Sequence, residues 1–260
     1  MNYRKFGFIG GGRITSVFLE VLTKDYVSQK NVTVCDINGN VLESLKKSFP
    51  EIYISLNNSD AAVADVLFIS LHPPVIKEVL NTIKNYISRE TILISLAPKI
   101  SVNKLSSYLD GFKKIVRSIP NSPSVISNGY NPLFFSDSLN YDERSSIIEI
   151  FEKFGEYKIV DENVMEAYAI ITAMGPTYFQ FQMNKLYELA HSFGLSEDDS
   201  RNAVYKMIEG TNNLLYKSKL NYKEVEDLIP VKPLKEKEAD ILSIYDSTLI
   251  PLFKKLTEGV

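Results

Sequence analysis

The sequence predicts an α/β protein, with a doubly wound parallel sheet in its first half and an all-helical domain in its second. In the first half, short apolar runs typical of strands buried on both faces alternate with amphipathic stretches of helical period. Alternation of strand and helix implies right-handed crossovers between parallel strands. From about Asp161 the strand-like runs stop, and helical stretches follow one another. We therefore expect two domains, residues 1–160 and residues 161–260.

Each strand of the predicted sheet is a short apolar run, and a helix is expected between most of them. The predicted strands are Lys5–Ile9, Val32–Asp36, Val66–Leu71, Ile92–Leu96 and Lys114–Arg117, with a weaker one at Tyr53–Ser55. The predicted helices are Arg13–Lys24, Asn40–Ser48, Pro74–Tyr86 and Val102–Tyr108. A further pair of strands is expected around a helix, in the order Asn131–Phe135, Asp142–Phe154 and Tyr157–Val160.

The second half contains helix starts and stops at suitable spacing. A helix is predicted over Asn163–Met174, and Pro176 begins a longer one that stops near Gly194. Ser196, which three acids follow, is a strong helix start, because carboxylates favour the positive end of the helix dipole. The helix after it carries an apolar stripe, which needs a partner within the domain or across a dimer.

Three glycines, Gly10 to Gly12, follow the first predicted strand and precede the first predicted helix. This is the place and shape of a dinucleotide-binding turn, in which Gly10 makes the tight turn and Gly12 leaves room for a pyrophosphate. The helix that begins near Arg13 offers unpaired N–H groups and a positive dipole end to the phosphates. The third position of the glycine pattern is Thr15, which is bulkier than the small residue expected there. A purely structural glycine turn is the alternative.

An acid, Asp36, ends the second predicted strand, roughly 20 residues beyond the glycines as in Rossmann domains. A carboxylate there can accept both ribose hydroxyls of NAD, and it repels the phosphate that one of them carries in NADP. The residues that follow, 37–40, are neutral, so Asp36 favours NAD over NADP. The alternative is that Asp36 only caps the next helix.

Composition and charge exclude several classes of protein. The formal net charge of −3 gives no electrostatic reason to expect a nucleic-acid partner. We expect no membrane span and no signal peptide, because no apolar run has the required length or place. The single cysteine, Cys35, cannot form an internal disulfide, which suits a reducing cytoplasm. His72 and His191 lie far apart in the sequence, so no metal site is expected.

Two turns after strands hold candidate site residues, because ligands bind at the carboxyl ends of parallel strands. His72 lies in the first turn, where it contacts a cofactor, acts as an acid or is only a polar surface group. In the second turn, Pro120 and Pro123 stiffen a loop around Asn121, which makes a rigid platform beside a nicotinamide.

The order of these motifs resembles that of the pyrroline-5-carboxylate reductases, over roughly residues 5 to 225. The family has a glycine turn, a Met-Pro-Asn-Thr-Pro loop and a Ser-Gly-Ser-Gly-Pro-Ala-Tyr segment, which are similar to Phe8–Arg13, Ile119–Pro123 and Thr172–Tyr178 here. The resemblance implies an N-terminal Rossmann domain and a helical domain that dimerises by interleaving helices. It also implies that NAD(P)H reduces a small cyclic imine carboxylate, which yields proline.

The resemblance assigns further residues to the cofactor. By position, those that would line it are Gly10, Gly12, Arg13, Ile14, Asn57, Leu71, His72 and Pro73. Asn57 matches a family Asn that faces the adenosine part.

Near the C-terminus the chain departs from the family. The Ser-Pro-Gly-Gly-Thr-Thr stretch that holds the substrate carboxylate is replaced by Pro230–Glu236, which contains no glycine. The family's turn cannot form there in the same way. Lys232 or Lys235 is either a substitute partner for a carboxylate or a solvated side chain. The change of Ser-Gly-Ser to Thr172–Met174 makes the expected pocket more apolar.

We expect an NAD(P)-dependent reductase of a small imine or carbonyl compound that need not be pyrroline-5-carboxylate, acting as a homodimer or higher homo-oligomer. The cofactor carries the chemistry, and the fold places its nicotinamide against the substrate carbon. Asn121, Thr172 and Tyr178 are the candidates for polarising the substrate. Alternatively Asn121 fixes its loop, Thr172 bonds to its own helix backbone, and Tyr178 is part of the core. A nucleotide-binding protein without turnover, and a deazaflavin-dependent NADP oxidoreductase with a similar glycine turn, remain open.

Overall fold

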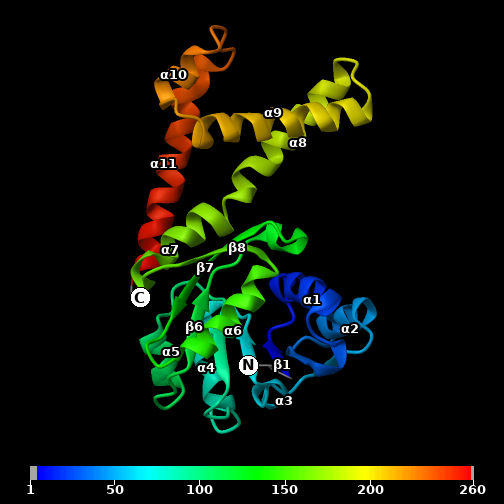
Figure 1. Ribbon diagram of the computed structural model, residues 1–260, viewed down its shortest axis with the longest axis vertical. Helices are drawn as coiled ribbons and strands as arrows, with labels where there is room; N and C mark the ends of the chain where they lie inside the picture. The colour runs from blue at the N-terminus through cyan, green and yellow to red at the C-terminus, as the bar shows by residue number, and fades with distance from the viewer. Residues whose placement is uncertain (1–4, 259–260) are drawn as a thin grey trace. The chain divides into compact units, whose positions relative to one another are not determined.

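The computed structural model describes residues 5–258, and within them eight strands form one sheet (Figure 1). The strands are β1 (Phe6–Ile9), β2 (Val32–Cys35), β3 (Tyr53–Ser55), β4 (Val66–Ile69), β5 (Ile92–Ser95), β6 (Ile115–Ser118), β7 (Gly129–Phe135) and β8 (Gly155–Ile159). Their order across the sheet is β3-β2-β1-β4-β5-β6-β7-β8. The chain runs outward from β1 to one edge and then resumes on the other side of β1. This doubly wound order confirms the predicted fold class.

One neighbouring pair departs from the predicted parallel arrangement. The six strands from β3 to β6 pair in parallel, but β7 is antiparallel to β6, and β8 is parallel to β7. The connection between β6 and β7 contains only the 3₁₀ turn Ser122–Ile126. A parallel neighbour needs a crossover of a dozen or more residues, usually a helix. The chain therefore turns back on itself at this point.

Helices cover both faces of the sheet. They are α1 (Arg13–Asp25), α2 (Gly39–Ser48), α3 (Ser59–Ala62), α4 (Pro73–Ile83), α5 (Val102–Tyr108) and α6 (Tyr141–Glu152), followed by α7 (Met165–Tyr168) and a π-helical turn, Ala169–Ala173. One cluster of buried side chains includes α1, α2 and α6, and another includes α3, α4 and α5.

Successive strand residues contribute to opposite clusters, as expected for strands buried on both faces. In β1, Phe8 belongs to the first cluster and Ile9 to the second. The ring of Phe8 stacks on that of Phe68 in β4, with centroids 4.6 Å apart. The two faces therefore hold the central strands β1 and β4 rigidly side by side.

The chain divides into two compact units. The first comprises the sheet and its helices as far as Met174, together with the chain from Phe253 onward, and the second is Gly175–Leu252. The second unit contains α8 (Pro176–Ser192), α9 (Glu197–Lys217), α10 (Tyr222–Asp227) and most of α11 (Lys235–Thr257). The predicted domain boundary after residue 160 stays a prediction; in the structure residues 161–174 pack with the sheet.

Candidate cofactor and substrate site

The glycine turn lies where the winding of the sheet reverses. Gly10 follows β1 with φ +98°, and a Cβ atom at this position would lie 2.4 Å from the carbonyl oxygen of Ser70, which follows β4. Only glycine fits a backbone that is both left-handed and so close to its neighbour. In doubly wound sheets, ligands bind in the crevice at this reversal, outside the carboxyl ends of the strands.

Thr15 explains how the turn forms without the third glycine of the pattern. Its side chain is fully buried, and its hydroxyl donates a hydrogen bond to the carbonyl of Gly10 at 2.5 Å. The extra bulk is therefore packed between helix α1 and the turn, and its polar atom is satisfied.

The N-terminus of α1 is free to hold an anion. Its N-cap is Gly12, no side chain caps it, and a Cβ on Gly12 would meet no atom within 4 Å. The hydroxyl oxygen of Ser70 is buried nearby in the turn after β4, with no hydrogen-bond partner among the described residues. Open space, uncapped N–H groups and an unused hydroxyl together fit the pyrophosphate of a dinucleotide.

Asp36 follows β2 and braces the glycine turn. One carboxylate oxygen accepts the N–H of Gly11 at 2.7 Å, and the other accepts the N–H of Asn38 at 2.8 Å. The interpretation of Asp36 as the cap of the next helix is wrong, because Asn38 is the N-cap of α2 and its side chain accepts the N–H of Asn40. Asp36 is half-buried, and each of its carboxylate oxygens can accept a further hydrogen bond from a ligand.

The other predicted cofactor residues lie after β3 and β4, along the same edge of the sheet. Asn57 is exposed, and its side chain accepts the N–H of Ser59 at 3.1 Å. Leu71 lies against the turn, 3.0 Å from a Cβ built on Gly10. His72 is exposed and forms the N-cap of α4, which begins at Pro73. The fold thus brings these positions to one edge, although its contacts alone assign them no role.

Asn121 and Thr172 meet in the structure, through backbone groups. The side-chain amide of Asn121 donates to the carbonyl of Thr172 at 3.2 Å, and its oxygen accepts the N–H of Tyr130 at 3.1 Å. The hydroxyl of Thr172 donates to the carbonyl of Tyr168 at 2.8 Å. The contacts of the alternative roles are therefore present: Asn121 fixes its loop, and Thr172 bonds to its own helix backbone. Asn121 keeps a second N–H and Thr172 an acceptor lone pair for other partners.

Tyr178 belongs to the second unit. Its ring packs edge-to-face on that of Tyr245, with centroids 6.1 Å apart, and burial and then Tyr245 raise the pKa of its phenol. The two rings line a largely apolar groove of about 360 Å³. These contacts are those of a packing residue of the helical domain, which is the alternative interpretation of Tyr178.

An ion cluster beside the carboxyl ends of β5 and β6 carries little local sequence signal. Arg117, in β6, has no exposed surface, and its guanidinium contacts the carboxylates of Glu162 at 3.0 Å and Glu166 at 2.6 Å. The same carboxylates accept the N–H groups of Val102 at 2.6 Å and Lys99 at 2.9 Å. A charged residue inside the apolar run of β6 was the one available hint.

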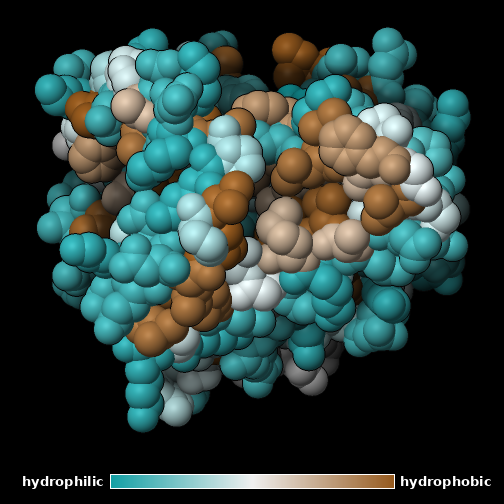
Figure 2. Space-filling view, turned by 90° about the horizontal axis from the view of Figure 1, so that it is seen from above, coloured by the Kyte–Doolittle hydropathy of each residue, from teal (hydrophilic) through white to brown (hydrophobic). Residues whose placement is uncertain are grey.

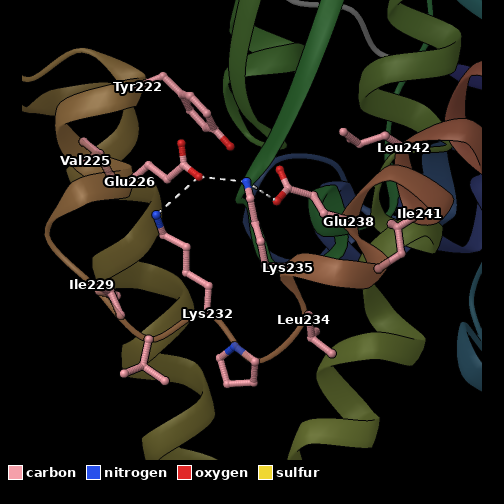
Figure 3. Close-up of a pocket in the computed structure, with 12 residues that line it drawn as sticks. Tyr222, Val225, Glu226, Ile229, Lys232, Leu234, Lys235, Glu238, Ile241 and Leu242 are labelled. Carbon is pink, nitrogen blue, oxygen red and sulfur yellow. Dashed lines mark hydrogen bonds and ion pairs between the residues drawn. The ribbon is translucent and has the colours of Figure 1, made fainter.

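A second cavity, of about 450 Å³, lies in the helical unit around the stretch that departs from the family (Figure 3). Its walls are mainly apolar, but Lys232 and Lys235 both point at Glu226, at 3.3 and 3.0 Å, and Lys235 also contacts Glu238 at 2.8 Å. The hydrogen bonds from Lys235 and Lys232 hold the pKa of Glu226 below its usual value. Both lysines thus have carboxylate partners within the chain.

Two kinds of feature are absent from the part of the chain that the structure describes. Residues 5–258 contain no cluster of His, Cys, Asp and Glu suited to a metal ion. None of the helices described there combines the length and the apolar character that crossing a membrane requires.

The first comparison with known proteins concerns the N-terminal part of the chain. Residues 5–99 match the family model described as NADP oxidoreductase coenzyme F420-dependent. Those residues contain the glycine turn, Asp36 and the turn after β4, so the match covers the candidate cofactor residues that follow β1, β2 and β4.

Curated relatives extend the similarity over most of the chain. The pyrroline-5-carboxylate reductase of Kluyveromyces lactis is 24% identical over 223 residues, covering 80% of this chain and 77% of that protein. The enzyme of the same name from Pasteurella multocida is 25% identical over 219 residues, covering 83% and 80%.

Solved structures share the fold. The Plasmodium falciparum pyrroline carboxylate reductase with NADP bound superposes with a TM-score of 0.75 at 22% identity, over 100% of this chain and 96% of that one. The Streptococcus pyogenes 1-pyrroline-5-carboxylate reductase gives 0.79 at 16% identity, over 97% and 98%. The structural matches confirm the predicted fold class, and the curated relatives confirm the resemblance that the motifs indicated.

Proposed function

We propose that this chain, a divergent member of the pyrroline-5-carboxylate reductase family, is an NAD(P)-dependent reductase of a small imine or carbonyl compound. The observation that carries the proposal is the close approach of Gly10 to Ser70, which places a tight glycine turn at the reversal of the sheet. The uncapped start of α1 faces that turn and supplies N–H donors for an anion.

The cofactor supplies the hydride, and this chain's residues bind and orient it. Backbone groups of the turn and of the first turn of α1, from Gly10 and Gly12 to Arg13 and Ile14, hold the pyrophosphate. Asp36 accepts the ribose hydroxyls and Asn57 faces the adenosine. Leu71, His72 and Pro73 line the middle of the cofactor where α4 begins.

NAD is the preferred cofactor in this proposal. Asp36 is held in place by two backbone N–H groups, so its charge cannot swing away from a ribose phosphate. A fixed carboxylate repels that phosphate, and the neighbouring residues 37–40 offer no cation to offset the repulsion.

On the substrate side, Asn121, Thr172 and Tyr178 are the residues proposed to orient the reacting group. Hydride transfer to an iminium carbon needs positioning and exclusion of water more than a strong acid. The spare N–H of Asn121 can donate to the oxygen of a carbonyl substrate or to the nitrogen of an unprotonated imine, while its other contacts keep the loop in place.

The substrate differs from that of the family in how any carboxylate is held. The stretch around Lys232 has no glycine, and both lysines that could replace the family's turn are paired with Glu226. We propose a small imine or carbonyl compound that is less dependent on a carboxylate clamp than pyrroline-5-carboxylate is.

The active form is proposed to be a homodimer or higher homo-oligomer. Among the described residues of the second unit, α8, α10 and α11 bury no residue fully, and many apolar side chains are exposed at the surface (Figure 2). A second copy of this chain is the partner that would cover them.

A cytoplasmic location suits the single cysteine, Cys35, which is buried. Burial raises the pKa of its thiol to about 11, so little of the reactive thiolate forms at neutral pH.

A nucleotide-binding protein without turnover is the second candidate, because the paired lysines leave no free cation at the stretch that holds substrate in the family. Calorimetry with NADH and NADPH, followed by NADH oxidation with a panel of cyclic imines and keto acids, tests both candidates. Oxidation with one panel member supports the reductase. Binding without any oxidation supports the second candidate, and no binding at millimolar concentration overturns both.

A further inference from the structure

The ion cluster around Arg117 joins segments that are far apart in the sequence. Arg117 pairs with Ser95 across β5 and β6, close to the carboxyl ends of both strands. Its partners Glu162 and Glu166 come from the segment after β8. Two carboxylates face one guanidinium; Arg117 and Glu166 are buried and Glu162 is partly exposed, and the cluster is held by directed hydrogen bonds as well as by charge.

The carboxylates also fix the loop that follows β5. Glu166 accepts the N–H of Lys99 at 2.9 Å, and Glu162 accepts that of Val102, at the start of α5, at 2.6 Å. Lys99 has φ +73°, a left-handed conformation that costs an L-residue free energy. Such a residue persists only where its surroundings determine it, and here the surroundings are the carboxylate of Glu166.

The same segment carries Thr172. The helix α7, which contains Glu166, continues into the π-helical turn Ala169–Ala173, and the carbonyl of Thr172 in that turn accepts the side-chain N–H of Asn121. Single π-turns inside helices are frequent at functional sites. One buried cluster thereby fixes the loop after β5, the π-turn and, through it, the loop after β6.

We infer that Arg117 and Glu166 are positioning residues for the nicotinamide end of the cofactor, and not for its adenosine end. This inference rests on the proposed function. The phosphate turn and Asp36 lie after β1 and β2, so a dinucleotide lying across the crevice extends its other end toward β5 and β6. The segments that the cluster fixes are those at the ends of β5 and β6. A displacement of about 1 Å at a reacting centre costs up to about 100-fold in rate.

The variant Glu166→Gln tests the inference, because it keeps the size and an acceptor oxygen but removes the charge. Glu143→Gln is the matched control, because Glu143 is a buried glutamate like Glu166. Its cationic partner is Lys114, at 2.7 Å, which lies at the opposite, amino end of β6. The full-length variants are titrated with ADP-ribose and with NADH by calorimetry, and the fluorescence of the bound nicotinamide is recorded.

For Glu166→Gln we expect the dissociation constant for ADP-ribose to stay within about twofold of that of the unaltered protein. The dissociation constant for NADH should rise at least about fivefold. The nicotinamide fluorescence of the remaining complex changes as well. In Glu143→Gln both ligands bind as in the unaltered protein, even where its melting temperature falls.

Two results overturn the inference: equal losses for both ligands in Glu166→Gln, or no change in NADH binding and fluorescence. Failure of the unaltered protein to bind either NADH or NADPH overturns the proposed function and this inference with it, and is thereby distinguished from the first two results. If Glu166→Gln does not fold, Arg117→Lys keeps the charge but loses the planar fork, and must show the same selective loss for NADH.

Discussion

The carboxylate of Asp36 accepts the N–H of Gly11 at 2.7 Å, so the acid that ends β2 also braces the turn that follows β1. Cofactor preference and turn geometry are thereby linked in one side chain. Asp36→Asn removes the charge, while its one amide oxygen can still accept the hydrogen bond from Gly11; the bond from Asn38 to the second oxygen is lost.

We expect Asp36→Asn to raise the preference for NADPH over NADH by at least about tenfold, which corresponds to about 1.4 kcal/mol. The reason is that the repulsion of a ribose phosphate disappears together with the charge. Calorimetric dissociation constants for both cofactors measure the ratio. Asp60→Asn is the control, because Asp60 is an exposed acid that lies after the neighbouring strand β3 and accepts a hydrogen bond from Ser55. This variant should leave the ratio unchanged. An unchanged ratio in Asp36→Asn would show that Asp36 does not face the ribose.

Gly10 and Gly12 make a matched pair for the glycine turn. A Cβ at Gly10 meets the carbonyl of Ser70 at 2.4 Å with φ at +98°, whereas a Cβ at Gly12 meets nothing within 4 Å. We expect Gly10→Ala to lower the free energy of unfolding by about 2–3 kcal/mol and Gly12→Ala by less than about 1 kcal/mol. Gly12→Ala nevertheless weakens NADH binding about tenfold, because the methyl group occupies the pyrophosphate space. Denaturant unfolding and calorimetry measure the two quantities; equal affinities for the unaltered protein and Gly12→Ala contradict the phosphate assignment.

Local features of the sequence predict the nucleotide-binding half well. The glycine turn, the strand before it and the acid after β2 lie within short segments, and each follows from backbone geometry and burial that neighbouring residues determine. Thr15 shows the limit: its bulk argues against the pattern, and only the fold reveals that its hydroxyl bonds to Gly10.

The remaining features depend on contacts between distant residues. Arg117 meets carboxylates that lie 45 and 49 residues away, and no local period encodes such a pairing. The left-handed backbone of Lys99 follows from one of these contacts, since nothing in its own sequence favours φ above zero. The reversal of β7 depends on a short connection, which the predicted strand pattern left undetermined. The sequence predicts a helical second half, but it sets no bounds for helix α11, which begins with the charged run Lys235–Glu238.

The pair formed by Glu143 and Lys114 makes stability depend on pH. Burial works to raise the pKa of Glu143, but the hydrogen bonds from Lys114 and from the N–H of Asn140 outweigh it and hold that pKa below the ordinary value of 4.5. A group whose pKa is lowered by folding stabilises the folded state above its unfolded pKa, and this contribution is lost as the pH falls through the folded pKa.

Glu143→Gln is therefore expected to cost about 1–3 kcal/mol of unfolding free energy at pH 7, and progressively less below about pH 4.5. Urea unfolding at a series of pH values measures the difference from the unaltered protein. Glu90→Gln removes the other, exposed partner of Lys114 and is expected to cost less than about 1 kcal/mol. A difference that grows as the pH falls would mean that the pKa of Glu143 is raised instead.

Lys99 offers a gain in stability at the position where the backbone is strained. In Lys99→Gly the N–H still donates to Glu166, while the cost of a left-handed L-residue disappears and the larger backbone entropy of glycine offsets part of the gain. We expect the free energy of unfolding to rise by about 0.5–1 kcal/mol, as measured by guanidinium unfolding. The same replacement at Lys104, inside α5, is the control and should lower it by about 1 kcal/mol, since that backbone is helical. Equal losses at both positions would mean that the left-handed conformation of Lys99 is not retained in solution, and that Glu166 does not fix this loop.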